Sequence, residues 1–100
     1  MKGFDLSGSA AFVTGASRGL GRAVSLALAE AGADVALGAT RADLLEEVAG
    51  EIRALGRRAF VCPLDVADPV SARESVEKVA GEMGRLDVLV NAAGICPRVG

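Results

Sequence analysis

Residues 10–21 read AAFVTGASRGLG, a short apolar run followed by three glycines. The apolar run over residues 10–14 is typical of a buried strand, and an apolar stripe of helical spacing begins after the glycines. Between a strand and a helix, glycines permit a tight turn and let a pyrophosphate approach bare backbone at the helix N-terminus. Glycines can also serve only close packing of helix and strand. Their position directly after the first strand of a βαβ unit favours dinucleotide binding.

The rest of the chain repeats this alternation of strand and helix. Apolar residues three and four apart predict helices over residues 18–31, 42–55 and 69–83. Short apolar runs predict strands over residues 10–14, 35–37, 59–62 and 88–90. In the first helix, the stripe expected to face the core consists of Leu20, Val24, Ala27, Leu28 and Ala31. Asp68 and Pro69 supply an N-cap and a first-turn proline for the third helix, and Gly84 ends it.

Strands that alternate with helices form consecutive βαβ units, whose right-handed crossovers produce a parallel sheet with helices on both faces. We therefore expect one α/β domain over residues 1–100, with strand order 3-2-1-4. In that order the direction of winding reverses between strands one and four, and ligands bind over the carboxyl ends of the strands there. Residues 15–21 and 91–94 should converge at that crevice.

Composition excludes several classes of function. The 100 residues include 13 acidic and 11 basic ones, for a net charge of −2, and the basic residues are scattered rather than clustered, which argues against a nucleic-acid surface. Histidine is absent, and Cys62 and Cys96 stand in no ligand-spaced cluster, so no metal site is predicted. No leader-like segment or apolar run long enough for a membrane span is present, which favours a cytoplasmic protein.

The spacing Thr-Gly-x-x-x-Gly-x-Gly in residues 14–21 resembles the short-chain dehydrogenase/reductase family. Asp65, after the third strand, looks like the aspartate of that family that hydrogen-bonds the adenine ring. Residues 91–94, Asn-Ala-Ala-Gly, resemble its Asn-Asn-Ala-Gly motif, with Ala92 replacing the second asparagine. The resemblance covers the whole chain and implies a Rossmann-type doubly wound sheet. Within the family, the opening residues 4–8 and the glycine loop look like gluconate 5-dehydrogenases and 3-oxoacyl-carrier-protein reductases.

The choice of nicotinamide cofactor depends on the end of the second strand. An NAD-binding protein needs an acid there for the ribose 2′-hydroxyl, and Ala39 stands in its place. Thr40, Arg41 and Arg18 could instead hold a 2′-phosphate, which favours NADP, with NAD as the alternative. The other interpretation of Arg41 is a solvated charge in the first helical turn. The residues expected to bind the cofactor are Gly15, Ser17, Arg18, Gly19, Leu20, Gly21, Thr40, Arg41, Asp65, Val66, Asn91, Ala92, Ala93 and Gly94.

The family implies hydride transfer between the nicotinamide and a carbonyl or secondary alcohol, with a Tyr and a Lys of a Tyr-x-x-x-Lys motif as catalytic residues. The sequence contains no Tyr, so no catalytic residue is predicted, and the chain is expected to be an inactive amino-terminal fragment of a homo-oligomeric enzyme. Ser17, Lys78 and Asp87 are not substitutes, and the last two are interpreted as surface charges.

The alternatives are a non-catalytic dinucleotide-binding or interaction module and an α/β domain without a cofactor. As an unpaired edge, the fourth strand is expected to promote association.

Overall fold

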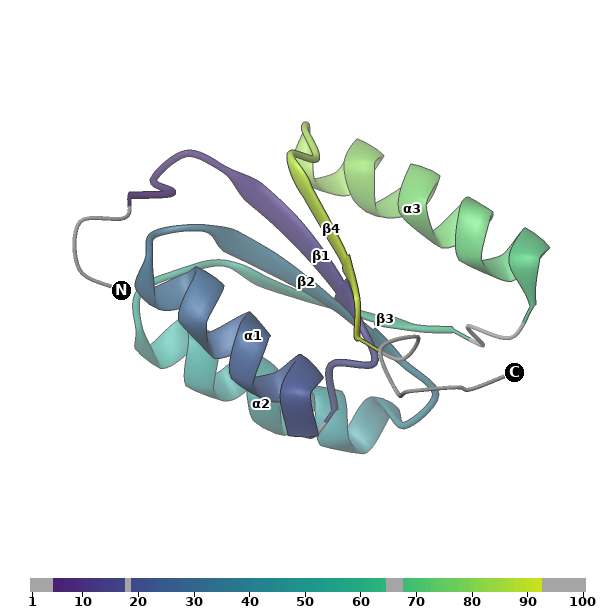
Figure 1. The fold of residues 1–100 in the computed structure, drawn as a ribbon, viewed down its shortest axis with the longest axis horizontal. Coiled ribbons are helices and arrows are strands. Elements are labelled where there is room, and N and C mark those ends of the chain that lie inside the picture. Colours follow the sequence, from purple (N-terminus) through teal and green to yellow (C-terminus); the bar gives the residue numbers. More distant parts are fainter. Residues whose placement is uncertain (1–4, 18, 65–67, 93–100) are drawn as a thin grey trace, which may run out of the picture.

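A computed structural model describes residues 5–17, 19–64 and 68–92. Four parallel strands form one sheet in the order β3-β2-β1-β4, which confirms the predicted topology (Figure 1). The strands are β1 (Ala10–Thr14), β2 (Asp34–Ala39), β3 (Ala59–Pro63) and β4 (Val88–Asn91). The helices between them are α1 (Gly19–Glu30), α2 (Ala42–Ala54) and α3 (Pro69–Met83). No helix in the described part of the chain has the length and apolar character to cross a membrane.

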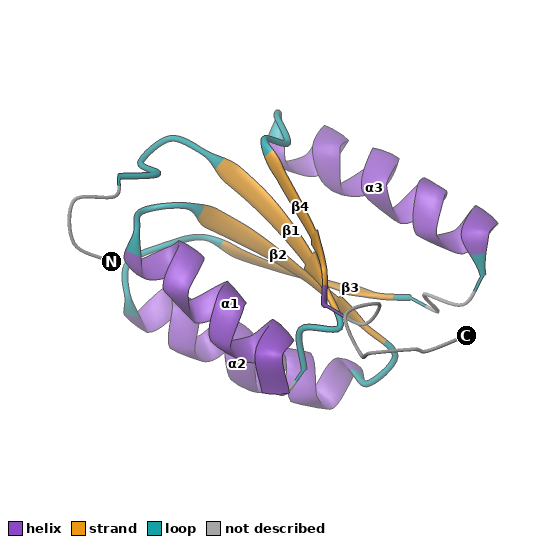
Figure 2. Cartoon of the chain, in the orientation of Figure 1, coloured by secondary structure: helices purple, strands orange, loops and turns teal. Residues whose placement is uncertain are grey.

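The helices cover both faces of the sheet, as the crossover rule predicts. Helices α1 and α2 lie side by side on one face, and α3 lies on the other (Figure 2). Side chains along a strand point alternately to the two faces, so β1 contributes to two separate cores. Its Val13 belongs to the core beneath α1 and α2, and its Phe12 to the core beneath α3.

The ends of α3 follow the predicted capping chemistry. The side chain of Asp68 accepts a hydrogen bond from the backbone N–H of Val70 at 3.0 Å, and Pro69 occupies the first turn. Gly84 ends the helix in the left-handed conformation, with φ of 83°. Glycine adopts this conformation at no steric cost, and the Gly84 N–H donates the last hydrogen bond of the helix to the Ala80 carbonyl.

The prediction for the core-facing stripe of α1 is wrong at Leu20, whose side chain is 53% exposed. The buried residues of this helix are Gly21, Ser25 and Ala29, which lie four residues apart. Small side chains on this face allow the helix to lie close to the sheet, and the Ser25 hydroxyl donates to the Gly21 carbonyl at 2.7 Å. The larger apolar residues are displaced to the flanks of the helix, where Val24 is only partly buried.

Asp87 connects the beginnings of β4 and β1. Its carboxylate accepts the Ala10 N–H at 2.8 Å, and its own N–H donates to the Ala10 carbonyl at 2.9 Å. Arg85 donates two hydrogen bonds to the same carboxylate, each at 2.8 Å. The hydrogen bond from Arg85, followed by that from Ala10, lowers the pKa of the Asp87 carboxyl below its ordinary value. This residue is therefore more than the surface charge that the sequence suggested.

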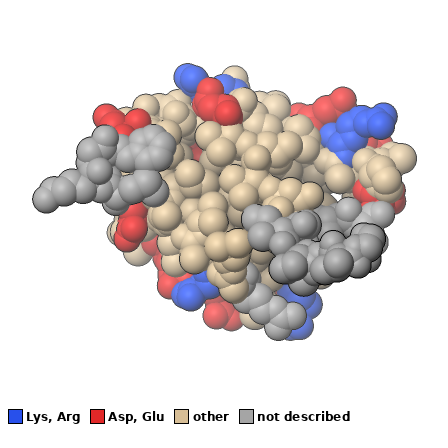
Figure 3. Space-filling view, viewed as in Figure 1, with Lys and Arg blue, Asp and Glu red and all other residues tan. Residues whose placement is uncertain are grey.

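Strand β4 forms an edge of the sheet, because among the described residues it pairs only with β1. Its Leu89 is 54% exposed. Figure 3 shows the molecule from the β4 side, where uncharged side chains occupy the middle of the face and charged ones lie around its rim. An exposed leucine on an unpaired edge strand favours association with another polypeptide.

Candidate functional site

Three of the predicted binding segments begin at the same edge of the sheet. Thr14, the last residue of β1, lies opposite Gly38 of β2 and Asn91 of β4 in the strand register. On the far side of β2, the Leu64 N–H donates to the Ala39 carbonyl at 2.9 Å. Because all four strands are parallel, the loops that follow them leave from this carboxyl edge.

The glycine loop turns sharply and rests on β2. Gly15 has φ of 73°, and the N–H groups of Gly15 and Ala16 donate to the Gly38 carbonyl at 2.7 and 3.2 Å. A Cβ atom on Gly21 would lie 1.9 Å from the Gly15 oxygen, so only glycine permits this approach of α1 to the loop. The turn is therefore held by backbone contacts within the chain.

The N-terminus of α1 is suited to an anion. The helix begins at Gly19, which has φ of 62°, and its first turn contains no acidic residue. The first N–H groups of a helix lack intrahelical partners, and the helix dipole places partial positive charge there. A Cβ on Gly19 would meet nothing within 4 Å, so the backbone is open on that side. Ser17, which precedes the helix, is half-buried, and Leu20 projects into solvent. These features fit a pyrophosphate.

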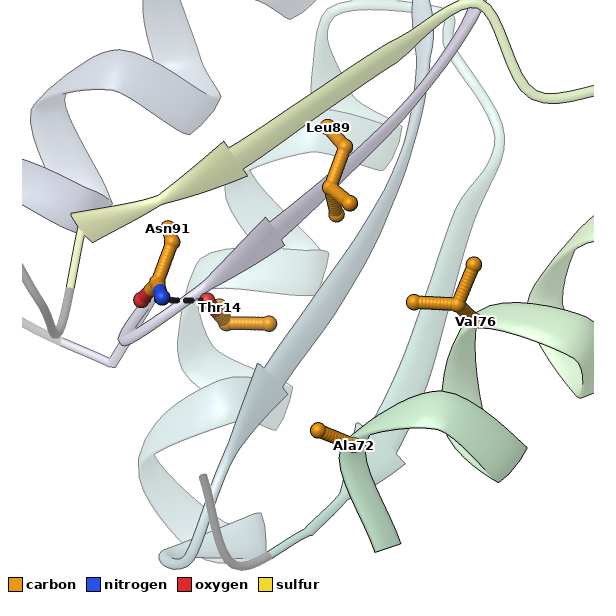
Figure 4. Close-up of a pocket in the computed structure, with 5 residues that line it drawn as sticks. All are labelled: Thr14, Ala72, Val76, Leu89 and Asn91. Carbon is orange, nitrogen blue, oxygen red and sulfur yellow. Dashed lines mark hydrogen bonds between the residues drawn. The ribbon is translucent and has the colours of Figure 1, made fainter. Parts of the chain in front are cut away.

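Thr14 and Asn91 join the ends of β1 and β4. The Thr14 hydroxyl lies 3.1 Å from Asn91 Oδ1 and 3.4 Å from the Val90 carbonyl (Figure 4). Thr14 is buried, whereas Asn91 is largely exposed at the edge. Ala92, the next residue, is half-buried and packs against the core beneath α1 and α2.

A small cavity of about 110 Å³ lies beside this pair, on the α3 side of the sheet. Its lining residues are Thr14, Ala72, Val76, Leu89 and Asn91. Sites for small molecules usually have volumes of about 300–1,000 Å³, so this cavity is too small for a dinucleotide. It also lies on the face opposite α1, so it is not the site suited to phosphate.

The end of β2 presents one buried and two exposed residues. Ala39 packs in the core beneath α1 and α2, and the following Thr40 and Arg41 are exposed. Arg41 occupies the N-cap position of α2 and donates to both carboxylate oxygens of Asp43, at 3.1 and 2.8 Å. This ion pair raises the pKa of Arg41 and lowers that of Asp43, chiefly through the hydrogen bonds between the two side chains.

The binding roles of all the predicted residues stay predictions. Five of these residues lie outside the described part of the chain: Arg18, Asp65, Val66, Ala93 and Gly94. In the described part, no group of three or more His, Cys, Asp or Glu side chains could hold a metal ion.

Two residues of this edge were missed in the sequence. Gly38 accepts the hydrogen bonds that fix the glycine loop, and a Cβ on it would lie 2.7 Å from Leu64 and 2.9 Å from Phe12. Glycine within a strand often marks a close approach, so its presence in β2 was an available signal. Asp43 was missed because sequence spacing does not reveal that its carboxylate pairs with Arg41.

Known proteins share both the sequence pattern and the fold. The profile of the short chain dehydrogenase family matches residues 9–100. L-rhamnose 1-dehydrogenase (NAD(P)(+)) from Sphingomonas sp. is 45% identical over 93 residues, which are 92% of this chain and 37% of that protein. The chain thus spans little more than a third of the length of this relative.

Solved structures agree with this similarity. A dehydrogenase/reductase from Sinorhizobium meliloti superposes with a TM-score of 0.86 at 40% identity, covering 91% of this chain and 36% of the other. An alcohol dehydrogenase from Thermococcus sibiricus, complexed with 5-hydroxy-NADP, gives a TM-score of 0.76 at 41% identity, covering 81% of this chain and 35% of the other.

Proposed function

The chain belongs to the short chain dehydrogenase family, and from that premise we propose that it binds a nicotinamide dinucleotide at the carboxyl edge of its sheet. It would thereby supply the cofactor-binding part of an oxidoreductase acting on a small carbonyl compound or secondary alcohol. The observation that carries the proposal is the glycine loop, which joins β1 to α1 beside the point where the strand order reverses. When bound, the nicotinamide supplies hydride acceptance or donation.

Different segments of the carboxyl edge would hold different parts of the dinucleotide. Gly15, Ser17, Gly19, Leu20 and Gly21 form the loop and the start of α1 that would hold the pyrophosphate. The end of β2 would hold the adenosine ribose, and the end of β4, with Asn91 and Ala92, would border the nicotinamide half. The proposal extends to Arg18, Asp65, Val66, Ala93 and Gly94 on their place in the sequence.

We favour NADP over NAD for this site. The side chain of Ala39 is buried and carries no carboxylate for a ribose 2′-hydroxyl. The two following residues, Thr40 and Arg41, are exposed and can donate hydrogen bonds to a 2′-phosphate. A guanidinium fork matches the geometry of phosphate oxygens.

Substitution of Arg41 by Ala tests the cofactor preference. Hydrogen bonds to charged groups contribute about 1.5–3 kcal/mol, so the lower end of this range for an exposed site predicts an NADPH affinity about tenfold weaker. NADH affinity should not change, because NADH lacks the 2′-phosphate. Arg57→Ala is the matched control, since Arg57 is an exposed residue just before β3, at the opposite edge of the sheet. Two outcomes would contradict a preference for NADP. One is an equal loss of affinity for NADPH and NADH in Arg41→Ala, and the other is tighter binding of NADH than of NADPH by the native protein.

The activity of the complete protein is tested by following NADPH absorbance with a panel of aldehydes and ketones. We expect carbonyl-dependent oxidation of NADPH. Binding of NADPH without turnover of any carbonyl compound would instead support a non-catalytic binding module. The proposal also includes a cytoplasmic location and assembly into a homo-oligomer, which cell fractionation and light scattering test.

A further inference from the structure

The ion pair between Arg41 and Asp43 occupies the side chain proposed to bind a 2′-phosphate. Arg41 donates through Nε to Oδ1 at 3.1 Å and through Nη2 to Oδ2 at 2.8 Å. This two-point arrangement uses the same guanidinium fork that phosphate oxygens would engage. Both side chains are 63% exposed, so solvent and ligands can reach the pair.

The position of the pair relates it to the cofactor edge. Arg41 lies three residues after Gly38, whose carbonyl holds the glycine loop, and it forms the N-cap position of α2. A 2′-phosphate arriving at the end of β2 would meet the guanidinium already paired and a carboxylate beside it. The phosphate must displace that carboxylate to use Nε and Nη2 together, and at the remaining N–H groups of the guanidinium it still meets the negative charge of Asp43.

We propose that Asp43 is a specificity-determining residue that competes with the cofactor 2′-phosphate for Arg41 and so restrains the preference for NADP over NAD. This inference rests on the proposed function. The competition is modest, because exposed ion pairs contribute little net free energy in water. It acts on NADP alone, since NAD carries a hydroxyl in place of the phosphate. Breaking the pair should therefore change the ratio of the two affinities.

The other acidic residues near the start of α2 do not share this arrangement. Glu46 lies 3.7 Å from Arg53, which donates to the Ala59 carbonyl. Glu47 is exposed one turn after Asp43, and it provides a matched loss of one negative charge on the same helix. Glu47→Gln therefore separates a general effect of charge from the effect of the pair.

The test measures NADPH and NADH affinities of purified protein by fluorescence titration at low ionic strength. In Asp43→Asn, we expect the Kd for NADPH to fall about two- to fivefold, the range that an exposed pair allows. The Kd for NADH should not change, which also shows that the substituted protein is folded. Glu47→Gln should leave the ratio of the two Kd values as it is in the wild type. In an Arg41→Ala background, Asp43→Asn should no longer improve NADPH binding.

Each other outcome overturns the inference. An unchanged ratio in Asp43→Asn excludes competition. Weaker NADPH binding in that variant would mean that Asp43 holds Arg41 in position for the phosphate. An equal gain in NADPH affinity in Glu47→Gln, or a gain in affinity from Asp43→Asn that persists in the Arg41→Ala background, would assign the effect to the general loss of negative charge. If the wild type binds neither NADPH nor NADH, the proposed function itself fails, whereas binding with an unchanged ratio refutes only the competition.

Discussion

Replacement of Gly21 by Ala should damage both the stability of the fold and the glycine loop. The added Cβ would lie 1.9 Å from the oxygen of Gly15 and 2.6 Å from its carbonyl carbon, and both are backbone atoms that cannot rotate away. Restoring a separation of roughly 3 Å requires the helix and the loop to move apart by about 1 Å. Overpacking of this kind costs about 1–3 kcal/mol, which exceeds the gain of about 1 kcal/mol from better helix propensity over most of that range.

Thermal unfolding measures the first effect, because each kcal/mol lowers Tm by about 4–8 °C in a domain of 60–100 residues. NADPH titration measures the second effect, and displacement of the loop by about 1 Å should weaken binding about tenfold, which corresponds to the loss of one hydrogen bond to a charged group at about 1.5 kcal/mol. The matched control is Gly50→Ala on α2, where a new Cβ meets nothing within 4 Å. That variant should be stabilised by about 0.5–1 kcal/mol. If Gly21→Ala melts no lower than the wild type and binds NADPH equally well, the close approach of α1 to the loop is not required.

Three further substitutions test other contacts of the fold. Thr14→Val removes the hydroxyl that bridges the ends of β1 and β4, and it should lower the free energy of unfolding in urea by about 1 kcal/mol. In Asp87→Asn the amide cannot replace the carboxylate that binds Ala10 and Arg85, so this variant should melt below the wild type at pH 7. The pKa of Asp87 is lower in the folded protein than its ordinary value of 3.8. The wild type is therefore more stable than Asp87→Asn above pH 3.8, and it loses this extra stability as the pH falls through the folded pKa. A difference in Tm that does not shrink as the pH falls below 3.8 would contradict this explanation. Leu89→Lys should reduce association of the chain of residues 1–100, measured by sedimentation velocity, and a wild-type chain that is already monomeric would refute the role given to the β4 edge.

The order of elements could be predicted from the sequence because local chemistry marks their ends. Asp68 and Pro69 favour a helix start in any context, and the positive φ at Gly32, Gly56 and Gly84 is accessible to glycine at no steric cost. Between these points the apolar periods distinguish strand from helix. The right-handed crossover then leaves few possible strand orders, and the predicted order is the one observed.

The error at Leu20 has a physical cause in how α1 packs. A hydrophobic stripe identifies the apolar face of a helix, but the line of closest contact with a sheet is set by where side chains are small. On α1 that line follows Gly21, Ser25 and Ala29, which hydropathy alone ranks below Leu20. Burial on this helix therefore depends on how close its backbone lies to the sheet, and the spacing of apolar residues does not predict that distance.

Contacts between distant residues could not be predicted from any local pattern. The bond from the Ala10 N–H to Asp87 joins residues 77 positions apart, and it exists only because β1 and β4 are neighbours in the sheet. The pair between Arg41 and Asp43 is local in sequence, yet its formation depends on side-chain conformations that the residue types leave open. The meeting of the predicted segments at the carboxyl edge could be predicted from the strand order, whereas the hydrogen-bond partners of their side chains could not.

The hydrogen bonds of the glycine loop restrict where an anion can bind. The N–H groups of Gly15 and Ala16 are already satisfied by the Gly38 carbonyl, so donating to a phosphate would require them to leave the sheet edge. Among the described residues, donors without this cost lie at the start of α1 from Gly19 onward, where helical N–H groups have no intrahelical partner. Gly15 and Gly38 thus shape the turn, and in the proposed function the N–H groups that would donate to the phosphate come from the end of the loop and the first turn of the helix. This division explains why Gly21 matters, because its close contact with Gly15 sets the start of α1 relative to the sheet edge.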